Sequence, residues 1–160
     1  MVELDAYAAD FRLYGHVELG EGRLSDQLNS TAELLIRDAH LEDLADGHVV
    51  ARRELTVAHD ELCAVVASGP RGDAARRLNT RTAHVEVEVG PYRVVGRVHG
   101  PQTADPFASV LRRAAWVPLT EATVAYSRGG EDVTDSLATL LVNRHFMRSF
   151  RVFEFGLNLP

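Results

Sequence analysis

Seven side chains in the second half of the chain are of types that bind phosphate groups or stack on nucleic-acid bases. They follow a predicted short helix or lie in the last predicted hairpin. Arginine donates several hydrogen bonds in a fixed fork, and an arginine beside an aromatic ring can hold a base. We therefore treat this set as the candidate binding surface: Arg112, Arg113, Arg144, His145, Phe146, Arg148 and Arg151.

The charge of the chain is divided unequally, which gives these arginines a second interpretation. Residues 1–68 carry 5 arginines against 14 acidic residues, a balance of −9. Residues 69–160 carry 12 arginines against 9 acidic residues, a balance of +3. The net charge of −6 disfavours a nucleic-acid partner, because that affinity depends on neutralising phosphates. The basic face therefore favours an acidic protein surface, either in the first half or on a second chain.

The sequence contains no motif of catalysis or metal binding. The chain has no lysine, which removes the P-loop lysine and a Schiff-base lysine, and it has no G-x-S-x-G elbow. Its seven histidines form no H-x-x-x-H or H-E-x-x-H pair. The single cysteine, Cys63, fits a small buried residue of a strand. We expect no catalytic residue, no metal site and no cofactor.

The order of apolar, glycine and acidic residues occurs twice along the chain. The opening segments align with an offset of 81 residues, which matches Gly15 with Gly96. The middle segments align with an offset of 83, and the closing segments with an offset of 85, which matches Leu62 with Met147. Two short insertions explain the drift, and both fall among turn residues or charges, as insertions in loops do. We interpret the chain as two copies of one small unit.

Alternation of apolar and polar residues predicts that each copy is mainly β. Each copy is expected to contain a strand, a short helix and three further strands, over residues 11–19, 24–29, 33–44, 49–57 and 62–67, and again over 84–98, 107–113, 116–126, 136–143 and 146–155. Gly90-Pro91 interrupts 84–98, which is therefore expected to be a hairpin or two strands. Gly15 lies at the centre of its strand and predicts a bulge or sharp bend, and Gly96 is its match.

These elements predict a mainly β fold with short helices. The order of strands fits a tandem, pseudo-symmetric repeat of small bent β-barrels of the SH3-like or Sm-like kind, because a short curved sheet buries its inner face by wrapping. The alternative is one continuous sheet or sandwich that both copies share.

Four residues around the first predicted helix are typical of a structural network. Arg23 and Asp26 can brace the helix as an ion pair, Ser25 stands near its cap, and Asn29 closes it. The second copy has different residues at these positions, with Pro106–Arg112 in place of the R-L-S-D-Q-L-N segment.

The R-L-S-D-Q-L-N segment follows a glycine-centred strand and precedes an apolar strand that contains Asp38-Ala39. This pattern resembles an uncharacterised bacterial family of small β-rich domains. A weaker likeness to Sm-like proteins rests on Leu140–Phe146 as a strand and turn. The resemblance implies a small β-rich domain and no known activity.

We expect an acidic first repeat over 1–67, a linker over 68–83 and a basic second repeat over 84–160. No apolar run approaches the roughly 20 residues of a membrane span, and the start lacks a signal-peptide pattern, so a bacterial cytoplasmic location is expected. The sequence favours a non-enzymatic adaptor or regulatory binding module that acts through protein–protein contact or self-association, including a homo-oligomer. The alternative is an RNA-binding, Sm-like protein that uses the arginine-rich face of the second repeat.

Overall fold

Ten strands dominate the computed structural model, which describes residues 2–18, 28, 33–67, 80–101 and 115–157. Their bounds are β1 Val2–Ala8, β2 Phe11–Val17, β3 Glu33–Asp43, β4 Val49–Ala58, β5 Leu62–Val66, β6 Thr80–Val89, β7 Tyr92–Pro101, β8 Trp116–Arg128, β9 Glu131–Asn143 and β10 Met147–Leu157. Short 3-10 turns, His59–Glu61 and Arg144–Phe146, join β4 to β5 and β9 to β10. The prediction of a mainly β protein is confirmed.

Some element boundaries differ from those expected. Strand β6 begins at Thr80, four residues before the predicted start, because its first residues continue the pairing with the end of β7. Strand β9 begins at Glu131 because its pairing with β8 runs up to the Gly129-Gly130 turn. Both predicted helices lie outside the described residues except for Leu28, which is buried.

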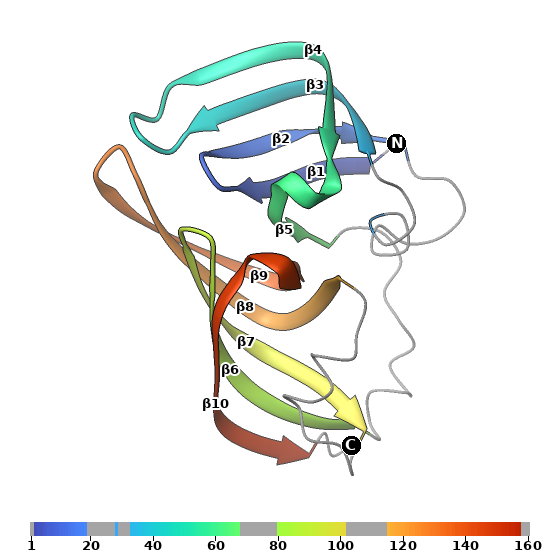
Figure 1. The fold of residues 1–160 in the computed structure, drawn as a ribbon, viewed down its shortest axis with the longest axis vertical. Coiled ribbons are helices and arrows are strands. Elements are labelled where there is room, and N and C mark those ends of the chain that lie inside the picture. Colours follow the sequence, from blue (N-terminus) through green and yellow to red (C-terminus); the bar gives the residue numbers. More distant parts are fainter. Residues whose placement is uncertain (1, 19–27, 29–32, 68–79, 102–114, 158–160) are drawn as a thin grey trace.

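Hydrogen bonding joins the ten strands into one antiparallel sheet, in the order β10-β6-β7-β8-β9-β5-β1-β2-β3-β4. The first half of the chain supplies β5-β1-β2-β3-β4 and the second half supplies β10-β6-β7-β8-β9, so β5 and β9 meet in the middle (Figure 1). Strands β10 and β4 form the two outer edges. The open, continuous sheet corresponds to the alternative that the sequence left beside separate barrels.

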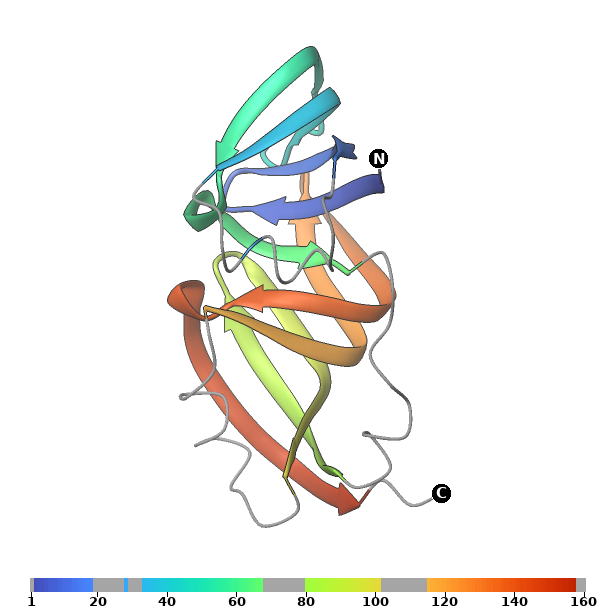
Figure 2. The same ribbon diagram turned by 90° about the vertical axis from the view of Figure 1, so that its right-hand side faces the viewer.

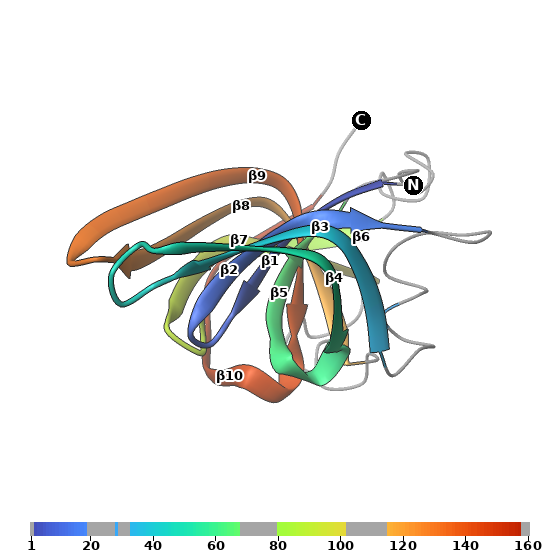
Figure 3. The same cartoon turned by 90° about the horizontal axis from the view of Figure 1, so that it is seen from above.

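Two hydrophobic cores lie on opposite faces of the middle strands. Side chains alternate between the faces of a strand, so neighbouring residues of β9 enter different cores. Leu140 and Val142 pack with the second half, whereas Leu141 packs with the first. Tyr7 of β1 joins the core of the second half, and Trp116 of β8 joins that of the first. Each core therefore includes side chains from both halves of the chain. Both halves of the sheet are bent (Figures 2 and 3).

Gly15 and Gly96 allow neighbouring strands to approach very closely. The register of β2 against β3 shifts at Gly15, as predicted, and that of β7 against β8 shifts at Gly96. A Cβ atom at Gly15 would lie 2.4 Å from Cγ2 of Ile36 and 3.1 Å from the carbonyl oxygen of Arg37. A Cβ atom at Gly96 would lie 3.2 Å from the carbonyl oxygen of Thr120. The contact is therefore tighter at Gly15.

Substitution of Gly15 by alanine should lower the free energy of unfolding by about 1–3 kcal/mol, the usual cost of overpacking a core. The added methyl group must displace Ile36, which is buried and stiff at χ1. Gly96→Ala is the matched control and should cost less. Urea denaturation measures both values, and a larger loss for Gly96→Ala would contradict the argument.

Candidate functional site

Five of the seven predicted binding residues lie on the edge strand β10 or on the turn before it, and one of them, Phe146, packs against the core of the second half. Arg144–Phe146 form the turn before β10, and Arg148 and Arg151 lie on β10 itself. The side chains of Arg148 and Arg151 are 64% and 71% exposed. The remaining two, Arg112 and Arg113, lie outside the described residues.

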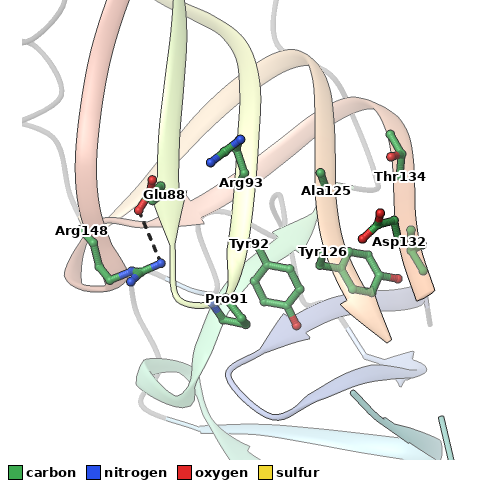
Figure 4. Close-up of a pocket in the computed structure, with 10 residues that line it drawn as sticks. Glu88, Pro91, Tyr92, Arg93, Ala125, Tyr126, Asp132, Thr134 and Arg148 are labelled. Atoms are coloured by element: carbon green, nitrogen blue, oxygen red, sulfur yellow. Dashed lines mark ion pairs between the residues drawn. The ribbon is translucent and has the colours of Figure 1, made fainter. Parts of the chain in front are cut away.

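Acidic residues of β6 accompany these arginines. Arg148 lies 3.5 Å from Glu88 (Figure 4), and Arg151 forms an ion pair with Glu86. Arg93 of β7 also reaches Glu86, at 3.4 Å. The β10 face is therefore a mixed array of both charges. Such an array fits a protein surface of mixed charge better than a continuous phosphate backbone.

The predicted network of Arg23, Ser25, Asp26 and Asn29 lies outside the described residues. Within the described ranges, no three histidine, cysteine, aspartate or glutamate side chains are grouped so as to hold a metal ion. His59 lies on a turn, and its Nδ1 atom is 2.7 Å from the carbonyl oxygen of Leu28. No helix of the described residues is long and apolar enough to cross a membrane.

The most deeply buried charge in the described part of the chain is Arg12, which the sequence did not single out. Arg12 is 2% exposed and lies on β2. Its Nη1 atom donates to the hydroxyl oxygen of Tyr126 at 2.7 Å and to Oδ2 of Asp135 at 3.0 Å. Its Nη2 atom forms an ion pair with Asp5, and its guanidinium carbon lies 3.7 Å from the ring centroid of Tyr7. Arg12 therefore links β1 and β2 to β8 and β9 of the other half.

The ring centroids of Tyr7, Tyr14 and Tyr126 lie 3.7, 5.0 and 5.5 Å from this guanidinium, and Tyr7 also belongs to a cluster of tyrosine rings that bridges the halves. Tyr7 meets Tyr92 and Tyr126 edge to face, with centroids 5.0 and 6.0 Å apart. The hydroxyl of Tyr7 donates to Asp135 at 2.8 Å, and that of Tyr92 donates to the carbonyl oxygen of Ala8 at 2.6 Å. Every polar atom of the group therefore has a partner across the junction or beside it, as buried polar groups require.

The electrostatics of this group favour a positive arginine among neutral hydroxyls. Burial raises the pKa of Tyr7, so its hydroxyl stays protonated and donates. Burial lowers the pKa of Arg12, but the Asp5 carboxylate, Tyr7 and Tyr14 together outweigh burial, so the net pKa is raised. Burial also raises the pKa of Asp5. The positive charge of Arg12 lowers that pKa, but the net pKa stays raised. The arrangement holds a charge in place; it does not prepare a group to transfer a proton.

Further hydrogen bonds tie the halves together away from Arg12. Nδ2 of Asn143, which is 2% exposed, donates to the carbonyl oxygen of Leu62 at 3.0 Å. Arg128 pairs with Glu42 at 3.0 Å, close to the turn that joins β3 to β4 and the turn that joins β8 to β9. The junction therefore contains buried polar groups, Arg12 and Asn143, among apolar side chains, and the more exposed Arg128–Glu42 pair at its rim.

The outer edges of the sheet differ in exposure from the middle. At the end of β9, which pairs with β5, Leu140 and Leu141 are buried. At the end of β4, which forms the opposite edge, Leu55 is partly buried and Thr56 is exposed. Phe153 on the β10 edge is 53% exposed. Val49 of β4 is 50% exposed, so each edge strand carries an exposed apolar side chain.

Comparison of the chain with family models, with curated proteins and with solved structures gave no match.

Replacement of Arg12 by methionine should lower the free energy of unfolding by about 2–3 kcal/mol. This is less than the roughly 3–5 kcal/mol for breaking a fully buried pair, because the carboxylates of Asp5 and Asp135 are about one third exposed. Arg128→Met removes a rim pair and should cost at most about 1 kcal/mol. Denaturant titration compares them, and equal losses would contradict the special role of Arg12.

The Cys63 thiol should react slowly in the native protein. Burial raises its pKa to about 11, so little thiolate exists at pH 8. A disulfide reagent such as dithionitrobenzoate should modify the folded chain about two orders of magnitude more slowly than the chain in denaturant, as expected for an unfolded thiol with a pKa of about 8.5. Equal rates in the two states would contradict this assignment.

Proposed function

We propose that this chain is a non-enzymatic structural module that works by self-association, and that its halves are two copies of one bent, barrel-like unit. The β5–β9 contact inside the chain is the observation that carries the proposal. It joins the last strand of one half to the fourth strand of the other, and the corresponding strands, β10 and β4, are the outer edges of the sheet.

The positions of the strands support the interpretation as two copies. An offset of 81 residues carries β1 and β2 onto β6 and β7, 83 carries β3 onto β8, and 85 carries β4 and β5 onto β9 and β10. The same offsets convert the Ala6–Val65 pair of β1 and β5 into the Val87–Phe150 pair of β6 and β10. Strand order and register are therefore the same in the two halves.

Details of the backbone follow the same offsets. Ile36 and Ala39 lie against Gly15, and their counterparts Leu119 and Ala122 lie against Gly96. Asp38 and Glu121 are the non-glycine residues with positive φ in the described chain, at 51° and 48°, and they too are 83 residues apart. Positive φ is uncommon for such residues, so its occurrence at matched positions favours one repeated unit.

The internal contact also defines which backbone groups point outward at the edges. The amide of Ala67 donates to the carbonyl oxygen of Thr139 at 3.1 Å, and Leu141 lies opposite Val65. Backbone groups of alternate residues point to the same side of a strand, so Thr139 and Leu141 face β5. At the edge of β4, the matching residues with backbone groups facing outward are Glu54 and Thr56.

The proposed contact is therefore a head-to-tail pairing of β4 in one copy with β10 in the next. Thr56 would pair with Phe150, and Glu54 with Val152, in the register of the β5–β9 contact. Unpaired edges are liable to join other strands. An edge whose register is defined by a matching internal contact can pair selectively. The partly buried Leu55 would become fully buried there, as Leu140 is.

Removal of one outward amide tests the proposal. Thr56→Pro deletes the outward N–H group and leaves the bonds of β4 to β3, because proline is tolerated on the open side of an edge strand. Light scattering after size exclusion should give the wild-type chain a mass of two or more copies at both low and high salt, and Thr56→Pro the mass of one copy. Thr56→Ala is the control and should assemble. A wild-type chain that stays single at millimolar concentration would overturn the proposal.

A further inference from the structure

A pocket of about 300 Å³ lies beside the β4 edge, in the first half of the chain. Its lining includes the acidic residues Asp10 and Asp43, together with His48 and Arg52. Phe11 and Leu55 are among its apolar lining residues. We propose that this pocket binds the Arg93 and Glu88 side chains of a second copy of the chain. The inference rests on the proposed self-association and specifies what its side chains recognise.

The corresponding place in the second half is already filled from within the chain. Offsets of 81, 83 and 85 carry Phe11, Asp43 and Leu55 onto Tyr92, Tyr126 and Leu140. The side chains that pack there, from the first half, are Tyr7 and Arg12. Tyr7 packs in the same core as Tyr92, Tyr126 and Leu140, and Arg12 donates to the hydroxyl of Tyr126. We call Tyr7 and Arg12, which lie on β1 and β2, the insert of the junction. We call the site that they occupy, formed by Tyr92, Tyr126 and Leu140 of β7, β8 and β9, its receptor.

The second half carries its own version of the insert. An offset of 81 carries Tyr7 onto Glu88 and Arg12 onto Arg93, and an offset of 85 carries Cys63 onto Arg148. Glu88, Arg93 and Arg148 line one pocket together (Figure 4), and the side chain of Arg93 is 63% exposed. Arg93 lies 3.4 Å from Glu86, which matches the pairing of Arg12 with Asp5.

The charges of the insert and of the empty receptor are complementary. At the place where Arg12 meets the hydroxyl of Tyr126, Arg93 of a second copy would meet the carboxylate of Asp43, with Asp10 beside it. Asp135, which accepts from Tyr7 and Arg12, corresponds to the apolar Val50 of this pocket. The opposite charge that the pocket offers to Glu88 is Arg52, whose counterpart Leu137 packs against the core that contains Tyr7. The proposed Arg93–Asp43 pair between copies thus takes the place of the buried Arg12–Tyr126 contact within the chain. Both of its residues are exposed in the single chain, as expected for a contact between chains that also exist apart.

Charge reversal in trans tests the pocket directly. Arg93→Glu alone would place a carboxylate against Asp43, and Asp43→Arg alone would place two arginines together, so each should weaken self-association at least about tenfold. An equimolar mixture of the two variants restores both pairs in alternating order and should associate within about threefold of the wild type. Analytical ultracentrifugation measures these constants. Asp10→Arg repeats the test without the loss of the turn bond that Asp43 accepts from Ala45.

The controls separate this inference from the proposed function. Arg37→Glu makes the same charge change at an exposed position of β3 and should associate like the wild type. Assembly that Thr56→Pro abolishes and Arg93→Glu leaves unchanged would overturn the pocket assignment and keep the edge pairing. Failure of the mixture to recover would also overturn the assignment. Absence of wild-type association would overturn the edge pairing, and the pocket assignment with it.

Discussion

The backbone pairing of β5 with β9 is the contact on which the rest of the structure depends. It makes one sheet out of two half-sheets, and it places strands in the middle that are buried on both faces. Each half contains too few residues to bury a large core by itself. By sharing the middle strands, the halves give Leu140, Leu141 and Val142 two cores to fill at once. The stability of either half is therefore a property of the whole sheet.

Arg12 determines how the two halves fit as well as how strongly they hold. An apolar side chain of similar volume could bury comparable area, and buried ion pairs often add little net stability. Arg12 adds geometric specificity to the contact. Its planar guanidinium requires Tyr126, Asp135 and Asp5 to lie at defined positions around it. A shifted register of β5 against β9 would leave the charge without these acceptors. Polar specificity of this kind suits a contact that must form in one way.

Local pattern predicted most of the strands because alternation of apolar residues is a local signal, but the predicted unit began at residue 11 and did not include β1, Val2–Ala8. The bulge at Gly15 was also predictable, since a glycine inside an alternating strand has few other roles. The position of Arg12 was not, because Arg12 and Tyr14 occupy the face that alternation assigns to solvent. That face is covered by the other half of the chain, and only tertiary pairing reveals it. The arginines of β10 were predictable as a group, but their acidic partners on β6, Glu88 and Glu86, lie 60 and 65 residues earlier in the chain.

The junction between the halves contains a rotation as well as a contact. Strand β9 reaches β5 with a fixed twist, so one half is turned by a set angle relative to the other. If β4 and β10 of successive copies adopt the same geometry, every further step repeats that angle. A closed ring forms when the steps complete a full turn, and an open helix forms when they do not. The number of chains in such an assembly would then be encoded within a single chain, in the twist between two of its strands.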